Sequence, residues 1–282
     1  MVSEQFLQFK IEAYSKNDLK AAPELELQAR DLILRDRGYL TTKEIIRHFE
    51  AKADFIFRHR FRTIYLDKIT RQPIDLHKLL KLKRSVDMEV RLNTSPETIV
   101  RIVAMPVAKE IADMRKCKAK REFKNVSQLY LKMLDWSIFI TSIKPDKADF
   151  KTLLDFYSLR WKIETIFKNW KSNLKFDKIH NVSNTQLKIL LRSRFLVIVL
   201  MQHIHSVVKH IIRKKLGRLL SFMKLTSYLS DKLYKLNDIM ESMKTTNNTI
   251  TNEIFSVSYY CCYDKRKDRS NFEEEMIKIF NL

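Results

Sequence analysis

The sequence predicts an α/β protein with a mixed sheet, followed by a mainly helical C-terminal region. Two short apolar runs, at residues 32–34 and 53–57, suit buried strands, and a helical pattern separates them. Residues 147–175 contain neither Gly nor Pro and predict a long helix. Only 2 Gly and 5 Pro occur in 282 residues, which disfavours folds that need many tight turns.

The N-terminal part predicts the beginning of the sheet. Residues Phe6–Tyr14 largely alternate apolar and polar side chains, which is typical of a strand with one buried face. Pro23 can open a short helix ahead of the apolar run Leu32–Leu34. That run predicts a buried strand, which ends at Asp36 before the turn residue Gly38.

A helix and a second strand follow. The helix begins at Thr41, with Glu44 three residues behind it as in a capping box, and the strand covers Ala53–Phe57. This order indicates an α/β sheet with Asp36 at the C-terminal tip of a strand, where open sheets usually bind their ligands. The alternative is that Asp36 only begins a turn, a common role for Asp at strand ends.

The middle of the chain has the character of an insertion between two parts of a core. Val86–Leu92 and Thr98–Val107 alternate in polarity and predict a β ribbon, and the lysine-rich residues 115–134 predict a helix. Residues Trp136–Ile143 then predict another strand, which a proline closes.

Four polar residues share one face of the helix predicted for residues 147–175. Tyr157, Arg160, Glu164 and Lys171 have offsets of 0, 3, 7 and 14, which places them within about 60° of one another on a helical wheel. A carboxylate between two cations suits a divalent metal and a phosphodiester together. The alternative is an ordinary amphipathic helix, because Arg160 and Glu164 have the i,i+4 spacing of surface ion pairs.

The pattern Tyr157-x2-Arg160-x3-Glu164-x6-Lys171 resembles the Tyr-Arg-Glu-Lys signature of the insertion-sequence-four family of bacterial DDE transposases. The segment that begins at Asp36, Asp-Arg-Gly-Tyr after an apolar strand, resembles the second-aspartate motif of that family. The resemblance covers about residues 5–215, and the insertion matches only in character.

The resemblance implies a ribonuclease-H-like sheet on which two aspartates and one glutamate bind two divalent ions, usually Mg²⁺. Asp36 would be the second aspartate and Glu164 the glutamate, so both would be catalytic residues and metal ligands. Tyr157, Arg160 and Lys171 would bind the DNA end near the ions. Such an enzyme cleaves DNA strands and transfers them by in-line phosphoryl transfer.

The first aspartate of the family has no counterpart in this sequence. Asp18 follows the first predicted strand and Asp31 opens the next one, so neither has the expected position. We therefore expect a ribonuclease-H-like core that lacks its first strand, and an N-terminally shortened chain. We also expect poor solubility, and very slow strand cleavage by this polypeptide alone, because one of three ligands is missing.

The expected organisation has four parts. They are residues 1–59, the first part of the core with the second Asp; 60–135, an insertion with a β ribbon and a basic helix; 136–215, the second part of the core with the signature helix; and 216–282, a C-terminal helical region.

A basic segment lies between Lys171 and Lys224. It contains 12 Lys or Arg and one acidic residue, Asp177, which gives a net charge of 12 − 1 = +11. Phosphate contacts there would supply affinity without reading sequence. The alternative, a solvated helix face over a buried apolar stripe, can hold at the same time. The predicted DNA-binding residues of this segment are Lys178, Arg192, Arg194, Arg213, Lys214 and Lys215.

The whole chain carries a net charge of +21, which suits a polyanionic partner. The alternative is that the lysines merely coat the surface. No CxxC spacing occurs among the three cysteines, and Cys261 and Cys262 suggest packing more than reactivity. His203 and His205 lie two residues apart, which is a weak metal pattern and favours a structural role.

We predict a transposase of an insertion sequence that binds double-stranded transposon ends and acts in the cytoplasm of a bacterium, associated with the nucleoid. A homodimer in a synaptic complex is a possible assembly. The longest uncharged apolar run is only Phe195–Met201, so no membrane span is expected. One alternative is a non-catalytic DNA-binding transposase remnant. Another is a general basic helical protein associated with RNA or DNA.

Overall fold

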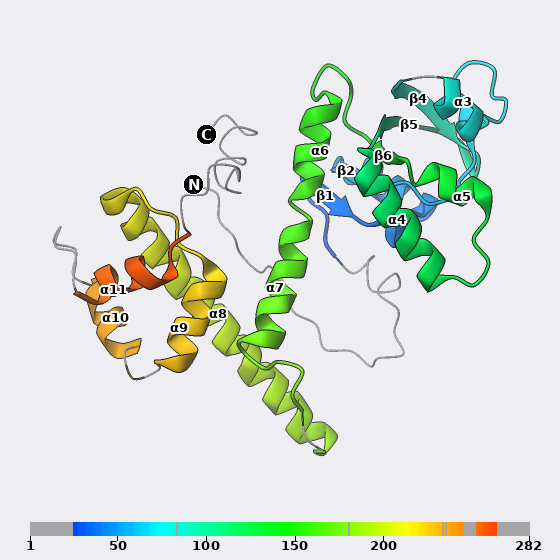
Figure 1. The fold of residues 1–282 in the computed structure, drawn as a ribbon. Helices are drawn as coiled ribbons and strands as arrows, with labels where there is room; N and C mark the ends of the chain where they lie inside the picture. The colour runs from blue at the N-terminus through cyan, green and yellow to red at the C-terminus, as the bar shows by residue number, and fades with distance from the viewer. Residues whose placement is uncertain are drawn as a thin grey trace. The chain divides into compact units, whose positions relative to one another are not determined.

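The computed structural model describes residues 25–82, 84–179, 181–232, 234, 236–244 and 252–263. It divides between Arg160 and Trp161 into two compact units, a sheet unit before this point and a helical unit after it (Figure 1). The predicted strand Phe6–Tyr14 lies outside the described residues. The four expected parts of the chain stay a prediction.

The sheet unit contains a six-stranded mixed sheet with the strand order β1-β2-β6-β5-β4-β3. β1 and β2 pair in parallel, and the other neighbours are antiparallel. The strands are β1 (Leu32–Arg35), β2 (Asp54–Arg58), β3 (Tyr65–Asp67), β4 (Val86–Leu92), β5 (Ser95–Pro106) and β6 (Trp136–Thr141). The predicted strands at 32–34, 53–57 and 136–143 are therefore confirmed, and the predicted β ribbon extends the same sheet.

Helices cover both faces of this sheet. The helical elements are η2 (Arg37–Tyr39), α2 (Thr42–Glu50), α3 (Leu76–Leu82), α4 (Lys109–Glu122), α5 (Gln128–Met133) and α6 (Phe150–Ser158). Phe55 and Phe57 of β2 pack with Ile45 of α2 and Leu80 of α3 on one face. Ile56, between them, packs with α6 on the other face. Alternate side chains of one strand thus enter two separate cores.

Two sequence predictions in this unit are wrong. Residues 25–31 form turns instead of a short helix, because tertiary partners take their backbone groups: the amide of Arg30 donates to the carbonyl of Lys52 over 3.0 Å, and Arg47 donates to the carbonyl of Leu25. The helix predicted for residues 115–134 is interrupted after Glu122, and α5 begins anew with Ser127 as its N-cap.

The predicted helix 147–175 is also interrupted. α6 ends at Ser158 and α7 (Trp161–Ser172) begins three residues later. At the break the amides of Leu159 and Arg160 donate to carbonyls three residues earlier, not four. This tightened 3₁₀-type turn separates the two helices without any Gly or Pro.

The helical unit is built around α8 (Asn184–Leu216). A capping box of Ser183 and Gln186 begins this helix, and Gly217 in the left-handed conformation ends it. Cys261 and Cys262 pack in the core with α8, and His205 of α8 is buried, which confirms packing roles for both cysteines and a structural role for His205. The remaining helices are α9 (Phe222–Asp231), α10 (Leu236–Lys244) and α11 (Asn252–Cys261).

By length and composition alone, α8 could cross a membrane. A third of its most apolar stretch is buried, where residues such as Ile204 and Val208 pack against α9 and α11. Leu196 and Val199 of the same helix are exposed. A core helix of a water-soluble unit meets the same criteria, so the expected absence of a membrane span stays a prediction.

Candidate functional site at the end of strand β1

Asp36 lies directly after β1, at the C-terminal edge of the parallel pair β1 and β2. Its backbone is extended and it precedes η2, but its side chain does not cap that turn. Asp36 is half-buried and its position is fixed by the strand, and its carboxylate oxygens are not used to cap η2.

Tyr157 meets this carboxylate from α6. Its ring is 5% exposed and packs against Phe139 of β6 with a centroid distance of 4.7 Å. Its hydroxyl donates to Oδ1 of Asp36 over 3.4 Å. Burial of the ring, and then the charge of Asp36, raise the pKa of Tyr157, so the phenol keeps its proton and remains a donor.

Arg160 lies beside Tyr157 in the turn after α6. Its Cζ atom is 5.6 Å from the centroid of the Tyr157 ring, within the range of a cation–π contact. The positive charge of Arg160 lowers the pKa of Tyr157 and so opposes the effect of Asp36, which raises it. The sequence pattern thus brings a carboxylate, a phenol and a guanidinium together at one end of the sheet.

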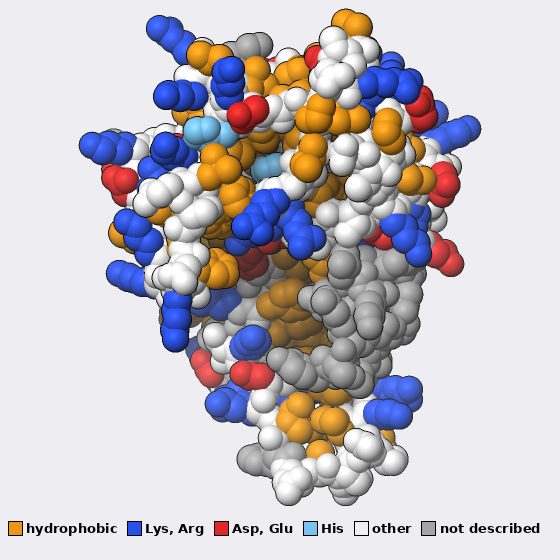
Figure 2. All heavy atoms as spheres, turned by 90° about the vertical axis from the view of Figure 1, so that its right-hand side faces the viewer, with side chains coloured by type: hydrophobic (Ala, Val, Ile, Leu, Met, Phe, Trp, Pro, Cys, Tyr) orange, Lys and Arg blue, Asp and Glu red, His pale blue; other side chains and the backbone are white. Residues whose placement is uncertain are grey.

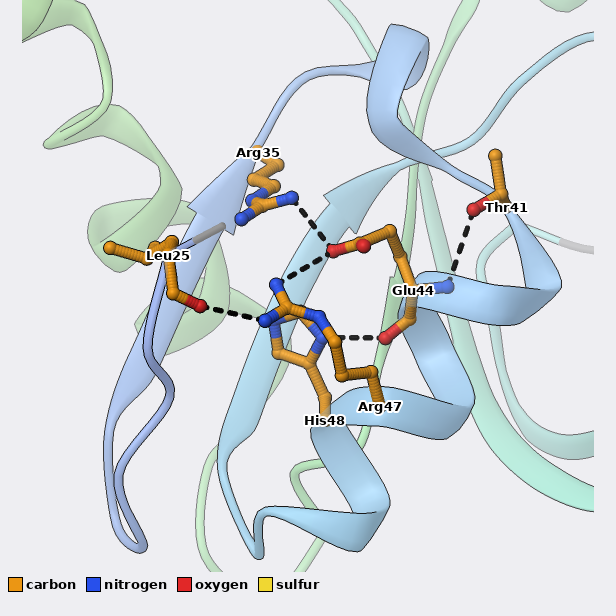
Figure 3. A network of polar contacts seen from close by, with 6 residues as sticks. All are labelled: Leu25, Arg35, Thr41, Glu44, Arg47 and His48. Carbon is orange, nitrogen blue, oxygen red and sulfur yellow. Dashed lines mark hydrogen bonds and ion pairs between the residues drawn. The ribbon is translucent and has the colours of Figure 1, made fainter. Parts of the chain in front are cut away.

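A buried ionic network fixes the strand that carries Asp36 (Figure 3). Arg35, the last residue of β1, donates to Oε2 of Glu44 on α2 over 2.8 Å, and Arg47 donates to the same oxygen over 3.1 Å. His48 contacts the carbonyl of Glu44 through Nδ1 at 2.6 Å. Glu44 therefore binds β1 to α2, and its side chain does not close the capping box that the sequence suggested; Thr41 alone accepts from the Glu44 amide.

A second buried arginine fixes the approach to α6. Arg101 of β5 is 3% exposed and donates twice to Asp87 of β4, over 2.7 Å each. It also donates to the carbonyls of Ile143 and Ala148 in the loop that leads to α6. This loop determines where α6 begins, and through α6 where Tyr157 lies.

Glu164 and Lys171 belong to the helical unit. They lie on one exposed face of α7, because seven residues make almost two full turns. Asn169, on the other side of α7, is buried and donates to Thr226 of α9 over 3.2 Å. The prediction that all four signature residues share one face required an uninterrupted helix. Because the helix is interrupted between α6 and α7, the common face is confirmed only for Glu164 and Lys171.

The predicted DNA-binding residues after α7 lie in the same helical unit. Lys178, Arg192, Arg213 and Lys214 are exposed and Lys215 is half-buried. Arg194 donates to the carbonyls of Phe176 and Lys178 over 2.6 and 2.8 Å, which holds the loop between α7 and α8. Arg194 therefore has a structural role, and its contact with DNA stays a prediction.

The oxygen donors of Asp36 and Glu164 are of the kind that Mg²⁺ binds. In the part of the chain that the structure describes, no group of three or more His, Cys, Asp or Glu side chains is placed to hold a metal ion. The residues therefore fit a divalent ion by the chemistry of their donors, while a complete ligand set is not gathered among the described residues.

The sequence prediction missed the residues that follow the second parallel strand. Arg58 ends β2, and His59 and Arg37 line a small pocket with it. A signal was present in the sequence, because the ends of parallel neighbours meet at one edge of a sheet and both apolar runs are followed by charged residues. Basic side chains are also prominent over acidic ones on the face of the molecule in Figure 2.

Fold and site together define a mixed α/β protein with a carboxylate at the C-terminal edge of its sheet and a separate helical unit. The chain belongs to the family of the transposase DDE domain, whose model matches residues 2–200.

Curated relatives support this membership. The transposase for insertion sequence element IS231D of Bacillus thuringiensis subsp. finitimus is 25% identical, over 99% of this chain and 63% of the relative. The transposase for IS231B of B. thuringiensis subsp. berliner is 24% identical, over 81% and 53%. The transposase for IS1151 of Clostridium perfringens is 22% identical, over 83% and 56%. The chain thus spans less than two thirds of these relatives, and no solved structure matches it.

Proposed function

We propose that this chain is the DNA-cleaving part of an insertion-sequence transposase of the insertion-sequence-four type, built on a ribonuclease-H-like core. The contact between Tyr157 and Asp36 carries the proposal, because it joins two motifs that lie 121 residues apart in the sequence. The family and the names of the relatives support the same function.

Asp36 and Glu164 are the residues proposed to hold the divalent ions, Mg²⁺ being the ion expected. When bound, such ions activate a water or hydroxyl nucleophile and stabilise the leaving oxygen of a phosphodiester. The Tyr157 hydroxyl orients Asp36 by donating to Oδ1. At 3.4 Å this hydrogen bond is long, as is common for sites that tighten only when substrate binds.

Arg160 and Lys171 are proposed to bind phosphate oxygens of the DNA end. A guanidinium can donate two parallel hydrogen bonds to a phosphate, and an ammonium contributes a point charge. Tyr157 is buried, so its proposed role is to position Asp36, in place of the direct DNA contact that the sequence suggested. The exposed basic residues of the helical unit add affinity that does not depend on sequence.

The second candidate function is DNA binding without cleavage. The observation that favours it is that the described residues gather no group of three metal-ligating side chains. Both candidates have double-stranded DNA as partner, and a homodimer in a synaptic complex suits either. They differ in whether Asp36 and Glu164 are needed for strand cleavage.

The test is nicking of a supercoiled plasmid that carries the DNA flanking the gene on both sides, with Mg²⁺ or Mn²⁺ present. For the enzyme, Asp36→Asn and Glu164→Gln abolish nicking and leave DNA affinity in place. Glu89→Gln removes an exposed carboxylate of β4 and serves as the control with the same charge change.

Nicking that survives both substitutions would overturn the assignment of these carboxylates. DNA binding without nicking, unchanged by either substitution, would establish the second candidate instead.

A further inference from the structure

Three arginines gather where β1 and β2 end. Arg37 follows Asp36, Arg58 is the last residue of β2, and Arg115 lies on α4. Arg37 and Arg58 line one pocket with Trp136 and Tyr130. Arg115 donates to the carbonyl of Trp136 and to Oγ of the following serine, over 3.2 Å each. The first residues of β6 thus lie between Arg115 and the pocket.

Arg58 lies on the face of the sheet that carries the candidate site. Side chains of β2 alternate, and Ile56 packs with α6, so Arg58 shares that face with Ile56 and with Tyr157. The positive charge of Arg58 also lowers the pKa of Tyr157, which places the two side chains near each other. Arg58 therefore lies at the same end and on the same face of the sheet as the Asp36–Tyr157 pair, and Arg115, which donates to Ser137 of β6, lies near Arg58.

None of the three arginines has an ion pair with a described carboxylate. Arg37 donates to the hydroxyl of Tyr130 over 3.0 Å, Arg115 to the two oxygens of β6, and no described group accepts a hydrogen bond from Arg58. By contrast, Arg35 and Arg101 of the same unit each donate to a carboxylate. No described carboxylate is thus paired with these three guanidinium groups, although the Asp36 carboxylate lies at the same end of the sheet.

Holding these cations together has an electrostatic cost. Burial, and then the nearby charge of Arg58, lower the pKa of Arg115. His59 contributes no charge, because burial lowers its pKa to about 4 and it is neutral near pH 7. An anion at this place would remove the repulsion between the guanidinium groups.

The shape of the cluster limits what the anion can be. The pocket that Arg37 and Arg58 line is small, with a volume of about 40 Å³, which is space for a few water molecules. The ligand therefore meets the guanidinium groups at the surface. A phosphodiester suits this geometry, since its two unesterified oxygens accept hydrogen bonds from a guanidinium fork.

We propose that Arg58 and Arg115, with Arg37 beside them, bind backbone phosphates of duplex DNA next to Asp36. This proposal rests on the proposed function and deepens it, because it adds a phosphate-binding site outside the signature helix. Since α4 lies within residues 60–135, the predicted insertion would contribute one of the ligands directly. Phosphate contacts of this kind fix the register of the DNA on the protein and carry no sequence information.

The test measures binding of a short fluorescein-labelled DNA duplex by anisotropy, between about 50 and 200 mM salt. Arg58→Gln and Arg115→Gln are each expected to weaken binding about tenfold at low salt. Each should reduce the slope of log affinity against log salt by about 0.9, the value for one lost phosphate contact. Arg58→Lys and Arg115→Lys keep the charge and should keep most of the slope.

Arg71→Gln is the control with a matched charge change. Arg71 follows β3, at the opposite edge of the sheet from β1, and pairs with Glu97 over 3.1 Å. Melting curves by circular dichroism check the fold of every variant. Arg58→Gln is the decisive variant, because no described hydrogen bond is lost with it.

If the wild-type chain binds the duplex and both Gln variants behave like Arg71→Gln, the proposal is wrong and the proposed function stands. If Arg115→Gln leaves the salt slope unchanged while lowering affinity, Arg115 acts only by supporting β6, which contradicts its part in the proposal. If the wild-type chain binds no DNA at any of these salt concentrations, the proposed function and this proposal both fail. Competition by inorganic phosphate as strong as by DNA would show a site for small anions, which also contradicts the proposal.

Discussion

The hydroxyl of Tyr157 on α6 donates to Oδ1 of Asp36 at the end of β1, over 3.4 Å. The tyrosine ring is held in the core by Phe139, and Asp36 is held by its strand, so the contact joins two fixed elements. This pair is the place where the strand motif and the signature helix meet in the sheet unit. The predictions below concern this pair and the structure that supports it.

Tyr157→Phe should leave the fold intact and weaken the site. The ring still fills its place, so the free energy of unfolding should fall by no more than about 1.5 kcal/mol, the value of one hydrogen bond. If Asp36 is a metal ligand, loss of its partner should weaken Mn²⁺ binding about tenfold, as loss of such supporting hydrogen bonds does in other metal sites. Titration of Mn²⁺ by electron paramagnetic resonance measures this. Equal Mn²⁺ affinity in variant and wild type would contradict the positioning role.

Glu44→Gln should destabilise the sheet unit by about 3–5 kcal/mol, because it removes the negative charge from the buried ion pair with Arg35. Chemical unfolding followed by circular dichroism measures the change. The control is Glu89→Gln, which breaks an exposed pair with Lys68 and should cost no more than about 1 kcal/mol. Similar losses for both variants would show that the network around Glu44 does not fix β1.

Stability should fall as the pH is lowered from about 6.5 to about 4, in part through His59. Burial lowers the pKa of this histidine from 6.5 to about 4, so in this window the unfolded chain binds a proton that the folded chain does not. The free energy of unfolding therefore rises with pH across the window, by on the order of 3 kcal/mol from this group.

His59→Gln should flatten that part of the pH dependence. Gln can still contact the hydroxyl of Tyr65, which lies 2.8 Å from Nδ1 of His59. A slope remains, because burial also lowers the pKa of His48. The measurement is the free energy of unfolding at several pH values for both proteins, and superimposable curves would refute the role of His59.

Gly217→Ala should destabilise the helical unit by about 1 kcal/mol. Gly217 ends α8 with φ +59°, a left-handed conformation that a Cβ atom strains even though no neighbour lies within 4 Å of it. Gly38→Ala is the matched control, since Gly38 also has open space and lacks the left-handed φ. Equal unfolding midpoints for the two variants would contradict the strain argument.

The sequence by itself determined the local elements of this protein. β1, α2, β2 and β6 have strong apolar patterns, and those patterns place Asp36 at the end of a strand. It also indicated the family, because the spacing of Tyr157, Arg160, Glu164 and Lys171 is visible without the fold, and the family model matches residues 2–200. It placed the start of α2 at Thr41-Thr42 correctly, since an N-cap depends on neighbours only three residues away.

Only the tertiary structure decided where long-range partners lie. The break after Ser158 has no Gly or Pro to announce it, and Glu44 turned from a capping residue into the partner of Arg35. Arg58 became a candidate ligand only once β2 lay beside β1 and α4 brought Arg115 to β6. The physical reason is that side-chain pairing and burial depend on which elements pack together, and the free energy of that packing outweighs local propensity.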